Sequence, residues 1–182
     1  MHRRGKFHSA IIAAWTCLAC LASSSSAAAV APDDPAQLLK RADAIKTANN
    51  EQFVRILKRL DAESTRLTPA QALTLRYFKA WQGAYTGDYA SALPALDAVE
   101  SASTDNNLRF RAGMTAINLL VIASRNADAY ARMGKMMELQ PLVSDPIARE
   151  QGLGVFAQLY NEAGQYDLAV DYADKLLAEN GS

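Results

Sequence analysis

The sequence predicts an all-α fold of about eight antiparallel helices arranged in four hairpins. Three observations predict this fold. From residue 35 onward the chain is rich in Ala and Leu, and its apolar residues recur at spacings of three and four with almost no period-two alternation. Capping side chains stand directly before proline at Asp34-Pro35, Thr68-Pro69 and Asp145-Pro146. Short polar links separate the helical segments, and short links bring successive helices back antiparallel.

Residues 1–31 have the features of a secretory leader. Three cations (Arg3, Arg4 and Lys6) precede a mostly apolar run from Ala10 to Ala22, and the small residues Ala27 to Ala29 follow it. This run is shorter than the roughly 20 apolar residues that a membrane-spanning helix needs. We therefore expect residues 1–30 to be a signal peptide and the rest of the chain to be exported.

Every cysteine and histidine of the chain lies in this leader, Cys17 and Cys20 among them. The alternative for Cys20 is acylation as a lipoprotein anchor, although Cys17 stands where such signals usually carry Leu. Removal of the leader leaves 16 basic and 19 acidic residues, a net charge of −3, without a basic stripe for nucleic acid. Without His or Cys, a Ser-His or Cys-His nucleophile and the usual zinc ligands are missing. We expect no enzyme activity, no metal and no cofactor.

The expected helices follow one another closely along the chain. They lie near residues 35–48, 50–64, 69–85, 88–100, 105–124, 126–139, 146–163 and 165–179. The proline caps mark the first, third and seventh of them, and Gln71 stands where the partner of Thr68 in a capping box is expected. The first two helices are interpreted as a degenerate hairpin, residues 31–67, that caps a stack of repeats formed by residues 68–182.

The evidence for repeats is a short segment that recurs. TGDYASAL (86–93) returns as AGQYDLAV (163–170), with a weaker copy RNADAYAR (125–132) between them. The offsets from Ala92 to Ala129 and from Ala129 to Ala169 are both slightly longer than the tetratricopeptide unit of about 34 residues. We call these two offsets the repeat steps. They predict a tetratricopeptide-like α-solenoid.

The last copy fits the tetratricopeptide pattern best. Leu153, Phe156, Ala157 and Tyr160 match its large-large-small-aromatic first helix, and Ala169 follows Tyr160 at the expected spacing. Gly164 is expected to end the first helix in a left-handed conformation, which makes Gly164 to Tyr166 the elbow of a hairpin. The residues expected to pack the repeats are Ala92, Ala129, Ala157, Tyr160, Gly164, Tyr166 and Ala169.

Three longer runs carry a resemblance to a known family. They are LRYFKAWQGAYTGDYASAL (75–93), LRFRAGMTAINLLVIASRNADAY (108–130) and AREQGLGVFAQLYNEAGQYDLAVDYADKLL (148–177). Together they resemble the N-terminal periplasmic region of tetratricopeptide-containing membrane diguanylate cyclases of Gram-negative bacteria. The resemblance implies a leader, a periplasmic repeat region, a transmembrane helix and a cytoplasmic cyclase domain.

The present chain carries neither an apolar span of membrane length nor a Gly-Gly-Asp-Glu-Phe motif, so no cyclase activity is carried over to it. Leu168, Val170, Leu176 and Leu177 leave its last helix with apolar residues that a further neighbour could cover. This favours the truncated sensory part of a longer protein, and the alternative is a shorter stand-alone relative.

Two amides suggest a binding groove. Asn118 interrupts the apolar run AINLLVIA, and Gln158 interrupts GVFAQLY at the equivalent position one repeat step later. In stacked hairpins the first helices line the concave groove, where amide side chains can bind the backbone of an extended peptide. The alternative is that both amides only bond a neighbouring helix. Possible companions on the same lining are Arg76, Arg109, Arg111 and Asn161.

The sequence thus predicts a periplasmic interaction or sensory module that binds a protein, a peptide or a small ligand. In a cyclase, such a module would pass ligand occupancy to the membrane. The alternative function is a stand-alone envelope scaffold without a signalling role. A protein or peptide partner is expected and nucleic acid is not. Contact with a membrane is expected only through a missing C-terminal segment or through lipidation at Cys20.

Overall fold

The computed structural model describes residues 34–180. The chain divides into a unit of residues 1–32 and a unit of residues 33–182, and the described residues all belong to the second. The predicted signal peptide, with Cys17 and Cys20, lies outside the described residues.

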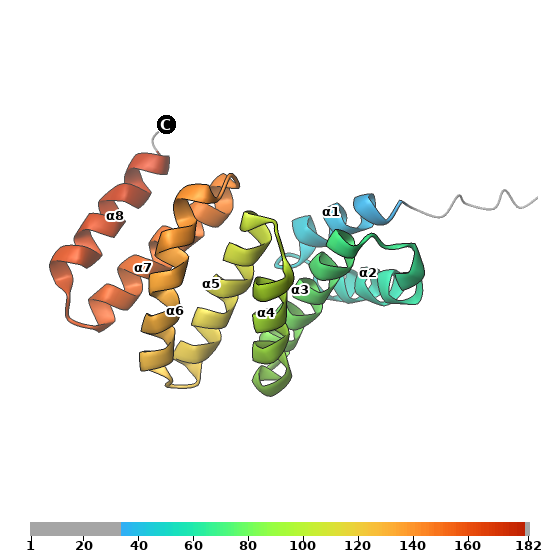
Figure 1. Ribbon diagram of the computed structural model, residues 1–182, viewed down its shortest axis with the longest axis horizontal. Helices are drawn as coiled ribbons and strands as arrows, with labels where there is room; N and C mark the ends of the chain where they lie inside the picture. Colours follow the sequence, from blue (N-terminus) through green and yellow to red (C-terminus); the bar gives the residue numbers. More distant parts are fainter. Residues whose placement is uncertain (1–33, 181–182) are drawn as a thin grey trace, which may run out of the picture. The chain divides into compact units, whose positions relative to one another are not determined.

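The predicted all-α fold is confirmed for residues 34–180, which form eight α-helices packed largely as consecutive hairpins (Figure 1). The helices are α1 (Pro35–Ile45), α2 (Asn50–Ala62), α3 (Pro69–Thr86), α4 (Tyr89–Ala102), α5 (Asn106–Ile122), α6 (Asn126–Leu139), α7 (Pro146–Glu162) and α8 (Tyr166–Asn180). Two 3₁₀ turns, Ser64–Arg66 and Gln140–Leu142, follow α2 and α6. Among residues 34–180, no helix is both long and apolar enough to cross a membrane.

The predicted caps start three of the helices. The carboxylate of Asp34 accepts a hydrogen bond from the amide of Ala36, and that of Asp145 accepts from Ile147 and Ala148. Thr68 and Gln71 form a reciprocal capping box: the Thr68 amide donates to Gln71 Oε1 at 2.9 Å, and the Gln71 amide donates to Thr68 Oγ1 at 3.3 Å.

Three elbows, each with a left-handed residue, connect the two helices within each of the last three hairpins. Gly87, Ser124 and Gly164 have φ angles of 88°, 58° and 73°. In each elbow the amide of the next residue donates to the carbonyl five positions back, as Asp88 does to Gly83, Arg125 to Leu120 and Gln165 to Tyr160. The elbows are separated by the same two repeat steps that align Ala92, Ala129 and Ala169. The start of each second helix is therefore in register with that period.

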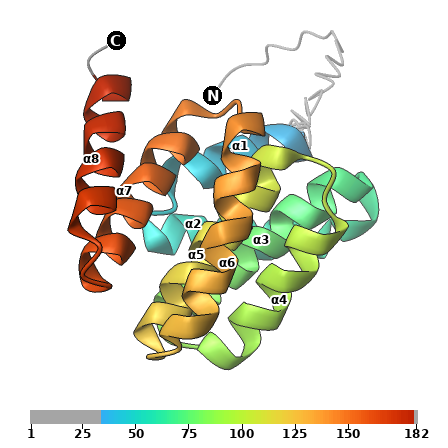
Figure 2. The same ribbon diagram turned by 60° about the vertical axis from the view of Figure 1, so that its left-hand side comes forward.

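The first helices of the hairpins contact one another in order. Contacts join α1 to α3, α3 to α5 and α5 to α7, while each second helix packs on its own first helix. The turned view shows α8 beside α7 at the edge of the described helices (Figure 2). Side chains on the row of first helices are thereby brought together from distant parts of the sequence.

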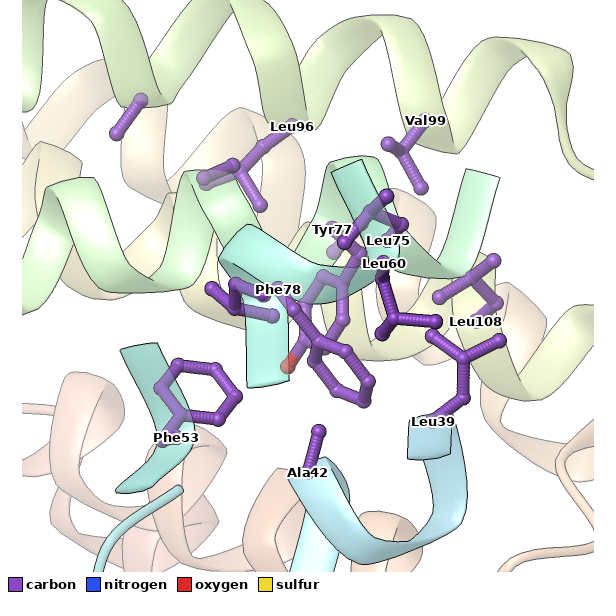
Figure 3. Packing of buried hydrophobic residues seen from close by; sticks show 14 of the residues in the cluster. Leu39, Ala42, Phe53, Leu60, Leu75, Tyr77, Phe78, Leu96, Val99 and Leu108 are labelled. Carbon is purple, nitrogen blue, oxygen red and sulfur yellow. The ribbon is translucent and has the colours of Figure 1, made fainter. Parts of the chain in front are cut away.

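The core consists of two clusters. The first joins α1 to α4 with one side of α5, and Phe53, Phe78 and Leu96 are fully buried in it (Figure 3). The second joins α5 to α8 around Phe110 and Phe156. Leu93 on α4 packs against both clusters. Among the expected packing residues, Ala92 and Ala129 are buried, Ala157, Tyr160 and Ala169 are half-buried, and Tyr166 is 65% exposed.

Candidate ligand-binding cavity

A cavity of about 360 Å³ lies among the first helices of the hairpins, between α3, α5 and α7 and beside the end of α1. Its volume is within the range of small-ligand sites, about 300–1,000 Å³. Tyr77 and Trp81 of α3 contribute aromatic side chains to its lining, and α5 and α7 contribute both polar and apolar ones.

Three of the six predicted groove residues line this cavity: Arg111, Asn118 and Gln158. Gln158 donates a hydrogen bond within its own helix, from Nε2 to Glu162 Oε1 at 2.9 Å. The Asn118 side chain is exposed and makes no hydrogen bond to another residue in the described part of the chain. Within residues 34–180, neither amide therefore bonds a neighbouring helix, as the alternative would require.

The other three predicted groove residues lie outside the cavity lining. Arg76 and Asn161 are exposed, on α3 and in the last turn of α7. Arg109 is half-buried, and its Nη1 donates to Asn106 Oδ1 at 3.2 Å. Arg109 lies two positions before Arg111, and two residues turn a helix by about 200°, so the two guanidinium groups leave α5 on different sides.

Arg111 is the best-anchored charge of the cavity. Its two terminal nitrogens bond both carboxylate oxygens of Asp43, with Nη1 3.1 Å from Oδ2, and its guanidinium lies over the Tyr77 ring at 5.1 Å from the centroid. Lys46 also donates to Asp43, from Nζ to Oδ1 at 2.6 Å. Two cations thus share one carboxylate. This corner of the cavity keeps one positive charge in excess.

Burial and neighbouring charges shift the pKa values of Asp43 and Arg111 in opposite directions. Burial by itself would raise the pKa of Asp43, but the hydrogen bonds and charges of Arg111 and Lys46 outweigh it and hold this pKa below its ordinary value. Burial would likewise lower the pKa of Arg111, but the neighbouring Tyr77 and Asp43 raise it above its usual value. The bidentate geometry and the ring beneath the guanidinium fix its position.

A second cavity of about 440 Å³, between α1, α5 and α7, adjoins the first. The two share Lys46, Thr47, Arg111, Ala148 and Gln151 in their linings. The Arg111–Asp43 pair therefore stands at the junction between them. An extended ligand could follow both hollows past this charged pair.

The two aromatic side chains of the lining, Trp81 and Tyr77, are fixed by contacts with neighbouring residues. The indole of Trp81 packs edge-on against the buried Phe53 ring at 5.5 Å and stacks with Tyr85 at 5.5 Å and 12° between planes. Tyr77 is buried, and its hydroxyl lies 3.5 Å from Thr115 Oγ1. These contacts fix both rings, and the Tyr77 ring lies directly against the Arg111 guanidinium of α5.

The sequence prediction missed Trp81 and Gln151, although the repeat period contains the signal. The two repeat steps relate Trp81 to Asn118 and Asn118 to Gln158, and the second of them also relates Arg111 to Gln151. All five line the cavity. Extending the elbow register to the first helices would have identified them.

In the described part of the chain, no group of three or more His, Cys, Asp or Glu side chains is placed to hold a metal ion. Comparison with models of protein families, with curated proteins and with solved structures found no match for this chain.

Replacing Asp43 with asparagine is expected to lower the free energy of unfolding at pH 7 by about 1 kcal/mol, the upper end for a partly exposed ion pair. The folded-state pKa of Asp43 is lowered, so its contribution is present above the unfolded value of about 3.9 and is lost as the pH falls through the folded value. Urea unfolding at pH 7, 5 and 3 measures this.

The matched control is Asp61→Asn, because the ion pair of Asp61 with Lys79 is exposed on both sides. It is expected to change the unfolding free energy by less than about 0.5 kcal/mol at every pH. An equal loss for Asp43→Asn at pH 3 and at pH 7 would contradict the assignment of the lowered pKa to the Arg111 pair.

Proposed function

We propose that this chain is an interaction module that binds a peptide, a protein segment or a small ligand in the cavity between its first helices. The observation that carries the proposal is the presence of Arg111, Asn118 and Gln158, from two helices, in one cavity lining with the aromatic side chains of Tyr77 and Trp81. Polar groups that converge on an apolar wall in a concave site are the usual composition of a ligand pocket.

The architecture we propose is a tetratricopeptide-like stack. Its support is the set of three left-handed elbows spaced by the two repeat steps and the succession of contacts between first helices. In such arrays each repeat contacts its neighbours, and the first helices present a continuous binding surface. The position of the cavity among the first helices supports this proposal.

The chemistry of the lining favours a ligand with an extended amide backbone and an acidic group. Amide side chains such as Asn118 and Gln158 can each donate to a carbonyl and accept from an N–H of a peptide. The excess positive charge at Lys46 and Arg111 attracts an anionic group to the junction of the two cavities. Trp81 offers a flat surface to an apolar side chain.

The cellular role we propose is that of a periplasmic sensory module, the truncated sensory part of a diguanylate cyclase. Its support is the leader-like segment at residues 1–31 and the resemblance of residues 75–177 to the repeat region of such cyclases. A stand-alone envelope scaffold is the second candidate. The exposed apolar side chains on α8, including Val170 and Leu177, fit both candidates, because a later segment of a longer chain or a separate protein could cover them.

The test is an alanine scan of the six predicted groove residues, read by the fluorescence of Trp81. A Trp15→Phe background leaves Trp81 as the one tryptophan of the chain. Random heptapeptides, in acidic and neutral pools, are titrated into the protein. We expect binding of acidic peptides that Arg111→Ala, Asn118→Ala and Gln158→Ala weaken by at least about tenfold, or about 1.4 kcal/mol each.

Arg76→Ala and Asn161→Ala are the matched controls, because both side chains are exposed outside the lining. They should leave the affinity unchanged, and circular dichroism verifies that every variant is folded. Equal losses for control and cavity variants, or no peptide binding in either pool, would count against the proposal.

A further inference from the structure

The second helices of the last three hairpins are in register, because each follows an equivalent elbow. The two repeat steps relate Leu93 on α4 to Tyr130 on α6 and Tyr130 to Val170 on α8. The same steps relate Glu100 to Met137 and Met137 to Leu177. We call these two sets the upper and the lower docking positions.

On α4 and α6, both docking positions contact the hairpin that follows. Leu93 packs against the second core cluster, and Glu100 accepts hydrogen bonds from Arg132 of α6. The Tyr130 hydroxyl donates to the Leu159 carbonyl of α7 at 2.9 Å. Met137 Sδ accepts a hydrogen bond from the hydroxyl of Tyr160 of α7 at 3.5 Å. At these positions, the second helix of one hairpin contacts the next hairpin.

On α8 the same positions are uncovered. Val170 is 59% exposed and Leu177 is 68% exposed. The neighbouring row shows the same difference: Ala92, Leu96 and Val99 of α4 are buried, whereas their equivalents Ala169, Ala173 and Leu176 of α8 are only half-buried. The α8 face therefore has the apolar surface of a hairpin junction without a second hairpin on it in the described part of the chain.

The charges on α8 indicate what kind of helix could bind its exposed face. Arg132 of α6 bonds Asp97 as well as Glu100 of α4, and the position of Asp97 corresponds to Asp174 on α8. Asp167 is also exposed on this helix, and so is Asp171, which pairs with Lys175. Two copies of α8 placed face to face would oppose carboxylate to carboxylate, which is unfavourable. A partner helix that carries an arginine would match the face.

We propose that the α8 face of Val170, Asp174 and Leu177 docks a helical hairpin of a partner protein. The first helix of this hairpin presents small and apolar residues, as α5 does with the buried Leu108, Ala112 and Ala116. Its second helix places an arginine on Asp174, as α6 places Arg132 on Asp97. This surface is separate from the cavity, so the proposal does not depend on the ligand that the cavity binds.

The test uses the full chain and a synthetic peptide of residues 105–142, which carries the α5–α6 hairpin as a surrogate partner. Hydrogen–deuterium exchange of the α8 amides is measured with and without the peptide. Because the peptide alone can fail to fold, the same segment is also appended after Ser182 through a flexible linker, where the effective concentration reaches about the millimolar range. We expect slower exchange of α8 in both formats.

Val170→Glu and Leu177→Glu are expected to abolish this protection, whereas Ile122→Glu, at an equally exposed apolar residue of α5, leaves it unchanged. An Arg132→Glu peptide should bind at least about tenfold more weakly, and Asp174→Arg in the chain should restore its binding. Absence of protection in both formats, failure of the charge exchange, or self-association of the chain that Val170→Glu abolishes would overturn the proposal.

Discussion

Replacing Phe156 with alanine is expected to lower the free energy of unfolding by about 3–5 kcal/mol. The Phe156 ring is fully buried and packs edge-on against Phe110 of α5, at 6.4 Å between centroids, and against Tyr172 of α8, at 5.6 Å. Truncation removes both ring contacts and leaves a cavity between three helices, which the backbone of a helical stack closes only partly. Urea unfolding followed by far-ultraviolet circular dichroism measures the loss.

Two variants bracket this expectation. Phe156→Leu keeps most of the apolar volume and should lose clearly less than the alanine variant. Tyr166→Ala removes an aromatic ring that is exposed on the neighbouring helix, and it should change stability by no more than about 0.5 kcal/mol. A loss below about 1 kcal/mol for Phe156→Ala, well under the usual cost of such a truncation, would mean that the second core cluster does not pack around this ring.

The parts of the fold that the sequence predicted are those with local causes. Asp34, Thr68 and Asp145 each bond amides within three positions of themselves, so their pattern is visible in a few letters of sequence. Gly164 was equally visible, since glycine adopts a left-handed conformation at little cost. Ser124 was not, because serine rarely takes this conformation and only the elbow period points to it.

The candidate site was predictable where a polar residue interrupts an apolar helix face. Asn118 and Gln158 gave that signal, and both line the cavity. Asp43 gave no signal, because it lies far before Arg111 in the sequence and belongs to the hairpin outside the repeats. Trp81 resembled a packing residue, since its indole does contact the core ring of Phe53. Partners so far apart in the sequence can be identified only from the tertiary arrangement of the helices.

Replacing Arg132 with methionine is expected to lower the free energy of unfolding by about 2 kcal/mol, between the values for exposed and fully buried ion pairs. The Arg132 side chain is 16% exposed, and its Nη2 and Nε lie 2.9 Å and 3.1 Å from Glu100 Oε2. Burial alone would lower the pKa of Arg132, but the hydrogen bonds and charges of Asp97 and Glu100 raise it. Methionine fills similar space and leaves Glu100, which is 17% exposed, without its cation.

A double-mutant cycle separates the charge from the packing of this side chain. If the loss comes from the unpaired carboxylate, Arg132→Met combined with Glu100→Gln should be more stable than Arg132→Met alone, with a coupling of about 0.5–3 kcal/mol. Arg125→Met is the control, because Arg125, the N-cap residue of α6, pairs among residues 34–180 only with Asp128 of that helix, and both are about half exposed. Zero coupling, or equal losses for Arg132→Met and Arg125→Met, would mean that α4 and α6 are held together by apolar contact alone. In that case an arginine on a partner would gain nothing from Asp174, and Leu177 and Val170 alone would have to select the partner of α8.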